Sequence, residues 1–133
     1  MEKKSICVDL DGVLADYRDG WKGIEHIGDP ILGAREFLEW LREQEYRIVI
    51  FTTRMNKESN PGLPLSDLLF KVVSWFHKNS LPFDEIYLGQ GKPIASAYVD
   101  DRAISCRPQD FGEREFELTK DRIGFVVEGK EPN

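Results

Sequence analysis

The chain has 133 residues and a formal net charge of −6 at pH 7. This length suits one domain with a single core, and we expect one domain over residues 1–127 followed by a flexible tail at residues 128–133. The acidic balance argues against binding nucleic acid or anionic lipid through a broad basic surface. The sequence shows no signal peptide and no apolar stretch of about 20 residues, so we expect a cytoplasmic protein outside the membrane.

The hydrophobic pattern predicts alternating strands and helices. The expected strands are apolar runs at residues 5–10, 47–51, 85–88 and 97–99, and the expected helices cover residues 30–44 and 65–79. Asp29 and Pro30 are typical of a helix start, and Pro82 prevents the second helix from continuing. Beyond Pro108, we expect a charged helix at residues 111–120 and a last strand at 123–127.

This alternation indicates the α/β class, with a central, mostly parallel sheet and right-handed crossovers. We expect a three-layer α/β/α, Rossmann-like domain. Cys7 and Cys106 are too few for a disulfide framework and do not form a Cys-x-x-Cys pair. We expect both to be buried small hydrophobic residues.

Polar residues follow the ends of the predicted strands, where ligands bind in an open parallel sheet. They are Asp9 with Asp11, Thr52, Lys92, and Asp100 with Asp101. Four acids packed together would repel by roughly 4 kcal/mol per close pair at an effective dielectric near 20. A divalent cation is therefore implied, and all-oxygen ligands favour Mg²⁺. No set of histidines and cysteines competes for zinc, and we expect His26 and His77 to be structural or solvated.

Asp9 and Asp11 are separated by one residue, so their side chains point to the same side of a strand end, and Gly12 allows a sharp turn. Each signal also has a simpler interpretation. Asp11-Gly12 is a common turn dipeptide, and the pair at residues 100–101 can be an acidic loop. Lys92 can be a solvated turn lysine, Thr52 a helix cap and Arg54 a surface base.

The order and spacing of four segments strongly resemble the four motifs of the haloacid dehalogenase-like (HAD) superfamily. They are Asp9-Leu10-Asp11-Gly12-Val13-Leu14-Ala15-Asp16, Ile50-Phe51-Thr52, Gly91-Lys92-Pro93 and Val99-Asp100-Asp101-Arg102. The first segment is specific. The Thr and Lys segments are weak alone and gain weight from their order.

The resemblance implies a phosphohydrolase that acts through an aspartyl phosphate. Asp9 would attack phosphorus, and Asp11 would protonate the leaving oxygen and later deprotonate the hydrolytic water. Thr52 would donate to a phosphoryl oxygen, and Lys92 would stabilise the intermediate. Mg²⁺ would bind the Asp9 carboxylate, the Asp11 carbonyl and the acids at the end of the last motif, Asp100 and Asp101.

HAD enzymes usually obtain substrate specificity from an inserted cap, and residues 12–29 and 54–64 are too short to form a cap domain. We therefore expect a minimal, capless member with an open site, which takes a large substrate or is closed by a neighbouring subunit of a homo-oligomer. Tyr17, Trp21 and His26 are weak candidates for substrate contacts.

Arg54 and the segment at residues 99–102 also resemble the phosphatase half of phage-type polynucleotide kinase-phosphatases. Thr53, Arg54 and Arg102 are accordingly expected to bind substrate. The acidic surface weakens the case for a polynucleotide, so a nucleotide or another small phosphoester is at least as good an expectation.

Two alternatives stay open. A non-enzymatic phosphoacceptor or phosphate-binding module also gathers acids, a hydroxyl and a lysine around Mg²⁺, but receiver domains place the acid pair on the first strand. The second alternative keeps the fold and makes the chain a phosphotransferase or a retired enzyme that serves as an assembly partner.

Overall fold

The computed structural model describes residues 3–56, 60–89 and 93–129. The chain divides into two compact units, residues 1–99 and residues 100–133. The first holds the sheet and two long helices, and the elements in the described part of the second are the helices after residue 107. The single domain expected over residues 1–127 stays a prediction.

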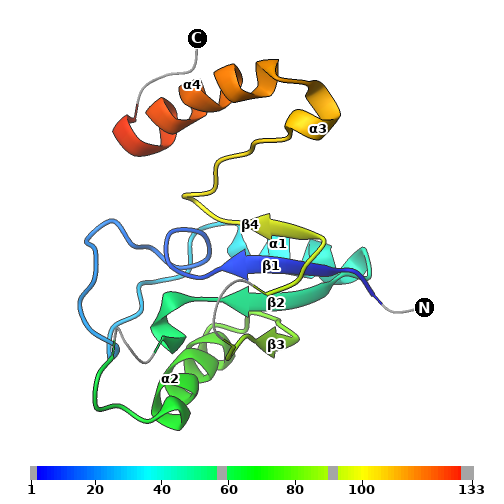
Figure 1. Ribbon diagram of the computed structural model, residues 1–133. Coiled ribbons are helices and arrows are strands. Elements are labelled where there is room, and N and C mark those ends of the chain that lie inside the picture. Colours follow the sequence, from blue (N-terminus) through cyan, green and yellow to red (C-terminus); the bar gives the residue numbers. More distant parts are fainter. Residues whose placement is uncertain (1–2, 57–59, 90–92, 130–133) are drawn as a thin grey trace. The chain divides into compact units, whose positions relative to one another are not determined.

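The first unit is built on a four-stranded parallel sheet with strand order β3-β2-β1-β4 (Figure 1). Its strands are β1 (Ser5–Asp9), β2 (Arg47–Phe51), β3 (Glu85–Ile86) and β4 (Ala97–Val99). The predicted α/β class and all four predicted strands are confirmed, although β3 ends two residues earlier than expected.

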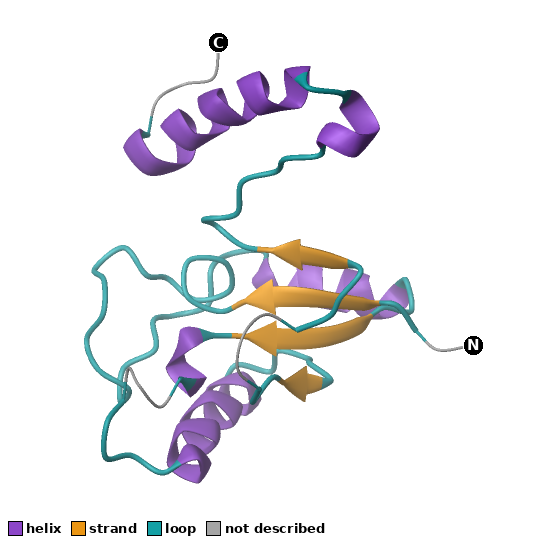
Figure 2. Cartoon of the chain, in the orientation of Figure 1, coloured by secondary structure: helices purple, strands orange, loops and turns teal. Residues whose placement is uncertain are grey.

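The two central strands are apolar without alternation because side chains cover both of their faces. Three consecutive residues are buried in the middle of β1 and three in the middle of β2. Cys7 in β1 is 3% exposed, as predicted. The segments that follow β1, β2 and β4 lead to helices (Figure 2).

Helix α1 (Ala34–Glu43) begins four residues later than predicted. Asp29 and Pro30 do not start it because their backbone closes the preceding loop: the Asp29 carbonyl accepts the Asp16 N–H at 2.8 Å, and Pro30 forms a bridge with Ala15. Gly33 then provides the left-handed turn before the helix, with φ of 96°. These tertiary contacts outweigh the local helix-start signal of Asp29 and Pro30, so the helix does not begin there.

Helix α2 (Leu65–Lys78) begins where predicted and ends one residue earlier than predicted, with Asn79 as its C-cap. Its buried face packs into the core beside the sheet. Phe76 is fully buried, with its ring centroid 5.1 Å from that of Trp75 and 4.9 Å from that of Phe83. The side chain of Phe70, on the same helix, is 68% exposed.

The second unit contains α3 (Pro108–Phe111) and α4 (Arg114–Glu128). The last strand predicted at residues 123–127 is wrong, because this β-branched run continues α4 until Gly129 adopts the left-handed conformation with φ of 70°. The cysteine of this unit, Cys106, is exposed and not buried as expected. Within the described residues, none of the helices has the length and apolar character needed to cross a membrane.

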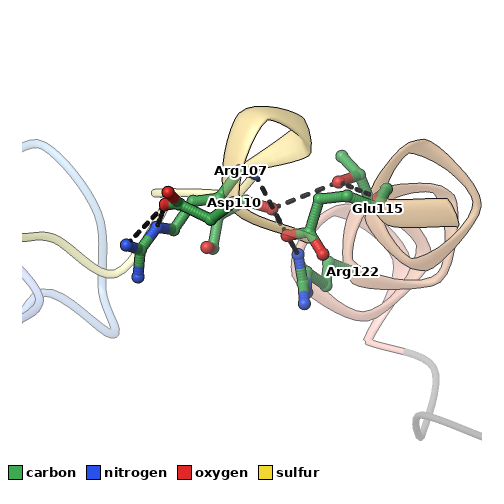
Figure 3. A network of polar contacts seen from close by, with 6 residues as sticks. Arg107, Asp110, Glu115 and Arg122 are labelled. Atoms are coloured by element: carbon green, nitrogen blue, oxygen red, sulfur yellow. Dashed lines mark hydrogen bonds and ion pairs between the residues drawn. The ribbon is translucent and has the colours of Figure 1, made fainter. Parts of the chain in front are cut away.

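A buried carboxylate joins the two helices of the second unit (Figure 3). Glu115, 2% exposed, accepts hydrogen bonds from the Arg107 N–H at 3.1 Å and from Arg122 Nη1 at 2.6 Å. The Arg122 guanidinium lowers the pKa of Glu115. The carboxylate therefore ties the residue before α3 to the middle of α4.

Replacing Phe76 by Ala removes a fully buried ring, and we expect a loss of about 3–5 kcal/mol in the free energy of unfolding. Phe70→Ala, on the solvent side of the same helix, is the control and should change it by less than about 1 kcal/mol. Urea unfolding followed by circular dichroism measures both. Equal losses of unfolding free energy in the two variants would contradict the burial of Phe76 in the core.

Candidate active site

The register of the parallel strands brings three of the predicted site residues to one edge of the sheet. Val8 lies opposite Val99 of β4, so Asp9 and Asp100 are the next residues on adjacent strands. Asp9 itself lies opposite Phe51, the residue before Thr52. Adjacent strands are about 4.8 Å apart, so strand pairing alone sets these residues side by side.

Acids follow the ends of β1 and β4. Asp9 is the last residue of β1, and Asp100 and Asp101 come directly after β4. Partial desolvation and a hydrogen bond with Asp100 raise the pKa of Asp101. Neighbouring like charges favour a bound cation or a shared proton. These three acids, which we call the acidic cluster, are therefore candidate metal ligands.

The chain turns sharply after β1, as predicted. Gly12 has φ of 88°, and the Leu10 carbonyl accepts the N–H groups of Val13, Leu14 and Ala15 at 2.9–3.3 Å. The Asp9 carboxylate accepts the Leu10 N–H at 2.8 Å. This turn fixes the backbone between Asp9 and Asp11, so the two carboxylates emerge from a rigid segment.

Asp11 forms a bidentate ion pair with Arg54. Arg54 Nε donates to Asp11 Oδ2 at 2.8 Å, and Nη2 donates to Oδ1 at 2.9 Å. The Arg54 side chain is 2% exposed and that of Asp11 is 14% exposed. The interpretation of Arg54 as a surface base is therefore wrong, and the second acid of the first motif is paired with a buried cation.

Two residues that the sequence did not link to Arg54 hold its side chain and backbone in place. The indole ring of Trp21 covers the guanidinium, with 4.9 Å between Arg54 Cζ and the ring centroid. Asn60, 6% exposed, donates from Nδ2 to the Arg54 carbonyl at 3.2 Å. Asn60 was missed because one asparagine in a Gly- and Pro-containing loop is typical of any turn.

Thr52 is both buried and a cap. Its side chain is 5% exposed, and Oγ1 accepts the Arg54 N–H at 3.2 Å at the start of the short helix η1 (Thr53–Met55). The capping interpretation of Thr52 is therefore confirmed, and its place at the end of β2 also agrees with the predicted site. Thr53 is exposed.

Arg102 directly follows the acid pair at residues 100–101. Arg102 is exposed, and its N–H donates to Asp100 Oδ1 at 2.8 Å. Lys92 lies outside the described residues. The roles assigned to Lys92, Thr53 and Arg102 stay predictions.

The loop at residues 16–29 is closed at its base and held against α2. The Asp16 N–H donates to the Asp29 carbonyl, and Trp75 Nε1 donates to the Gly28 carbonyl at 2.9 Å. A Cβ at Gly28 would lie 2.0 Å from the Asp16 carbonyl oxygen, so only glycine fits this approach. Lys71 pairs with Glu25 at 2.6 Å.

A cavity of about 210 Å³ lies between this loop and Arg54. It is lined by polar residues of the loop and by Arg54: Asp16, Tyr17, Asp19, Gly20, Lys22, His26, Gly28, Asp29 and Arg54. The Arg18 guanidinium holds the pKa of Asp16 at about 2, so Asp16 is ionised at neutral pH and paired with Arg18. Tyr17 and His26, two of the predicted contacts, therefore line a cavity, whereas Trp21 covers Arg54.

Two solved structures are similar to this chain. A conserved protein from Bacteroides thetaiotaomicron is 21% identical, with a TM-score of 0.54 over 98% of this chain and 94% of its own. A structure from Vibrio cholerae is 28% identical, with a TM-score of 0.53 over 96% of this chain and 99% of its own. Both cover nearly the whole length and support the fold. No protein-family model and no curated protein sequence matches the chain.

We expect a divalent cation to stabilise the wild-type protein by about 2.7 kcal/mol at a hundred times its dissociation constant. Asp100→Asn removes one charged ligand and should abolish most of this effect. Thermal unfolding with MgCl₂, MnCl₂ or EDTA measures it, and Asp121→Asn, an exposed acid of α4, is the control. An equal shift in Asp100→Asn and wild type would exclude the cluster as the binding site.

Proposed function

We propose that the chain is a Mg²⁺-dependent phosphomonoester hydrolase of the HAD superfamily, with a three-layer, capless domain. The observation that carries this proposal is the strand register that pairs Val8 with Val99, so that Asp9 and Asp100 each follow a paired residue. Asp11 follows two residues after Asp9. A first-strand Asp-x-Asp with an acid pair on the adjacent strand is the arrangement that the sequence motifs imply.

The residues of the acidic cluster suit Mg²⁺. They offer only oxygen ligands, in a partly exposed place where the ion can keep several waters. Partial desolvation, and after it the neighbouring Asp100, raise the pKa of Asp101, and a divalent ion would offset the negative charge of these two acids. Asp9, Asp100 and Asp101 would hold the ion, with the Asp11 carbonyl as a further ligand. When bound, Mg²⁺ neutralises charge on the phosphoryl oxygens.

The proposed reaction has two displacements at phosphorus. In the first, an Asp9 carboxylate oxygen forms a bond to phosphorus while the bond to the leaving oxygen breaks, and Asp11 gives its proton to that oxygen. In the second, water attacks the aspartyl phosphate, Asp11 takes back a proton, and Asp9 and inorganic phosphate are released. Thr52 and Lys92 would donate hydrogen bonds to the phosphoryl oxygens.

The proposed substrate is a small phosphoester such as a nucleotide. The cavity of about 210 Å³ beside Arg54 is below the usual range of ligand pockets, roughly 300–1,000 Å³, so it suits a small group. Its aspartates, together with the net charge of −6, disfavour a polyanion. A polynucleotide end is therefore the weaker candidate for this site.

The alternative function is a phosphoacceptor module that takes a phosphoryl group and does not hydrolyse it. Asp11 discriminates between the two, because proton transfer to a leaving group is needed for turnover and not for binding. A carboxylate that is 14% exposed beside the nucleophile, in a defined bidentate pair, supports the enzyme.

Asp9→Asn should lower phosphate release by about 10³-fold or more, since the amide cannot form the covalent intermediate. Phosphate release is measured on p-nitrophenyl phosphate, nucleotides and sugar phosphates, with Mg²⁺ or EDTA. Asp121→Asn is the control and should keep wild-type activity. Circular dichroism establishes that each variant is folded.

Turnover that survives Asp9→Asn would rule out Asp9 as the nucleophile. No turnover by the wild type on any substrate, with Asp9 labelled by acetyl phosphate in Mg²⁺, would establish the phosphoacceptor instead. Single-turnover quenching with radioactive substrate distinguishes a labelled intermediate from simple binding.

A further inference from the structure

We propose that Arg54 is the positioning residue for proton transfer, which holds the Asp11 carboxylate toward the leaving group. This inference rests on the proposed function and extends it to a residue that none of the four sequence motifs assigns to this role. Arg54 neither gains nor loses a proton in it. The proton moves from Asp11 to the leaving oxygen as the bond between that oxygen and phosphorus breaks.

The contact between Arg54 and Asp11 fixes an orientation as well as neutralising charge. Two parallel donors reach the two carboxylate oxygens at 2.8 and 2.9 Å, which sets the plane of the carboxylate. A carboxylate has about four lone-pair sites, so one on each oxygen stays available for a proton. A lysine ammonium in the same place would supply the charge without fixing the plane.

Arg54 can act as a fixed support because it is itself held on several sides. Its backbone N–H donates to Thr52 Oγ1, its carbonyl accepts from Asn60, and Trp21 covers the guanidinium. The side chain is 2% exposed, so solvent does not compete for its donors. Loose catalytic groups lose rate steeply with small displacements, and this arrangement limits them.

A second bidentate arginine–aspartate pair, on the loop at residues 16–29, is an ordinary surface ion pair and serves as a comparison. Arg18 donates from Nε and Nη2 to the Asp16 carboxylate, but its side chain is 89% exposed. Such a pair is exchanged with water and contributes little. The geometry of the two pairs is similar, and burial distinguishes the one at Arg54.

Space for a ligand adjoins Arg54. Arg54, Tyr17 and His26 line the same cavity, whose described lining includes neither Asp9 nor Asp11. In the proposed reaction, the group released from phosphorus would move from Asp11 toward this cavity. Arg54 Nη1 is buried and has no hydrogen-bond partner within the part of the chain that the structure describes. The other two guanidinium nitrogens, Nε and Nη2, both donate to Asp11, so the side chain makes its hydrogen bonds to this acid.

The test compares two substrates that differ in their need for an acid. An alkyl phosphate leaves as an unstable alkoxide and needs a proton, whereas p-nitrophenolate is stable as an anion. With Arg54→Lys, kcat/KM for the alkyl phosphate should fall by about 10²-fold, the lower range for general acid catalysis. For p-nitrophenyl phosphate, kcat/KM should stay within about fivefold of wild type.

The turnover number adds a second readout. kcat/KM reports the first displacement, but kcat also includes hydrolysis of the aspartyl phosphate, where Asp11 must act as a base for every substrate. Arg54→Lys should therefore lower kcat and KM together on p-nitrophenyl phosphate. Trp21→Leu, which uncovers the guanidinium at a half-exposed position, should show the same substrate selectivity with smaller losses.

Arg47→Lys is the matched control, since Arg47 lies at the other end of β2 in an exposed ion pair with Glu85. It should leave both substrates unaffected. Equal losses of kcat/KM on the two substrates in Arg54→Lys and Trp21→Leu would overturn the positioning role while leaving the phosphatase assignment intact. If Arg54→Lys does not fold, Trp21→Leu decides alone. A wild type without turnover on either substrate would overturn both proposals.

Discussion

The parallel pairing of β1 with β2 and β4 is the constraint on which the candidate site depends. Because the three strands run in the same direction and in register, the residues that follow them emerge at one edge. Side-chain contacts do not create this convergence. The hydrophobic cores of β1 and β2 hold the register, since a slip by one residue would turn their buried side chains outward. Packing far from the site therefore determines where its charges meet.

The sequence was informative wherever the local pattern and the tertiary structure agree. The strands and α2 follow from apolar runs bounded by turn residues, and Asp9, Asp11, Thr52 and the acid pair follow from strand ends. The pattern failed where longer-range contacts compete with local signals. Asp29-Pro30 is a good helix start, but its carbonyl closes a loop, and the β-branched residues 123–127 remain helical beside a buried ion pair. The burial of Arg54 could not be predicted, because it depends on Trp21 and Asn60 from separate loops.

The buried pair between Arg54 and Asp11 is costly as a source of stability, because both charges leave water. Hydrophobic residues of similar volume would often stabilise a fold equally well. In the proposed role of Arg54, the pair is retained because it fixes the geometry of the acid and not because it stabilises the fold. The apolar core in the rest of the first unit offsets the local cost.

The closed base of the loop at residues 16–29 determines when conformational entropy is lost. The backbone hydrogen bond between Asp16 and Asp29 and the close approach at Gly28 order the loop during folding, before any ligand arrives. A ligand that contacts Tyr17 or His26 would then meet side chains on an already restricted backbone, which lowers the entropic cost of binding. The loop thus behaves as a preformed wall, and selectivity among substrates would follow from the shape of that wall instead of from loop closure around each ligand.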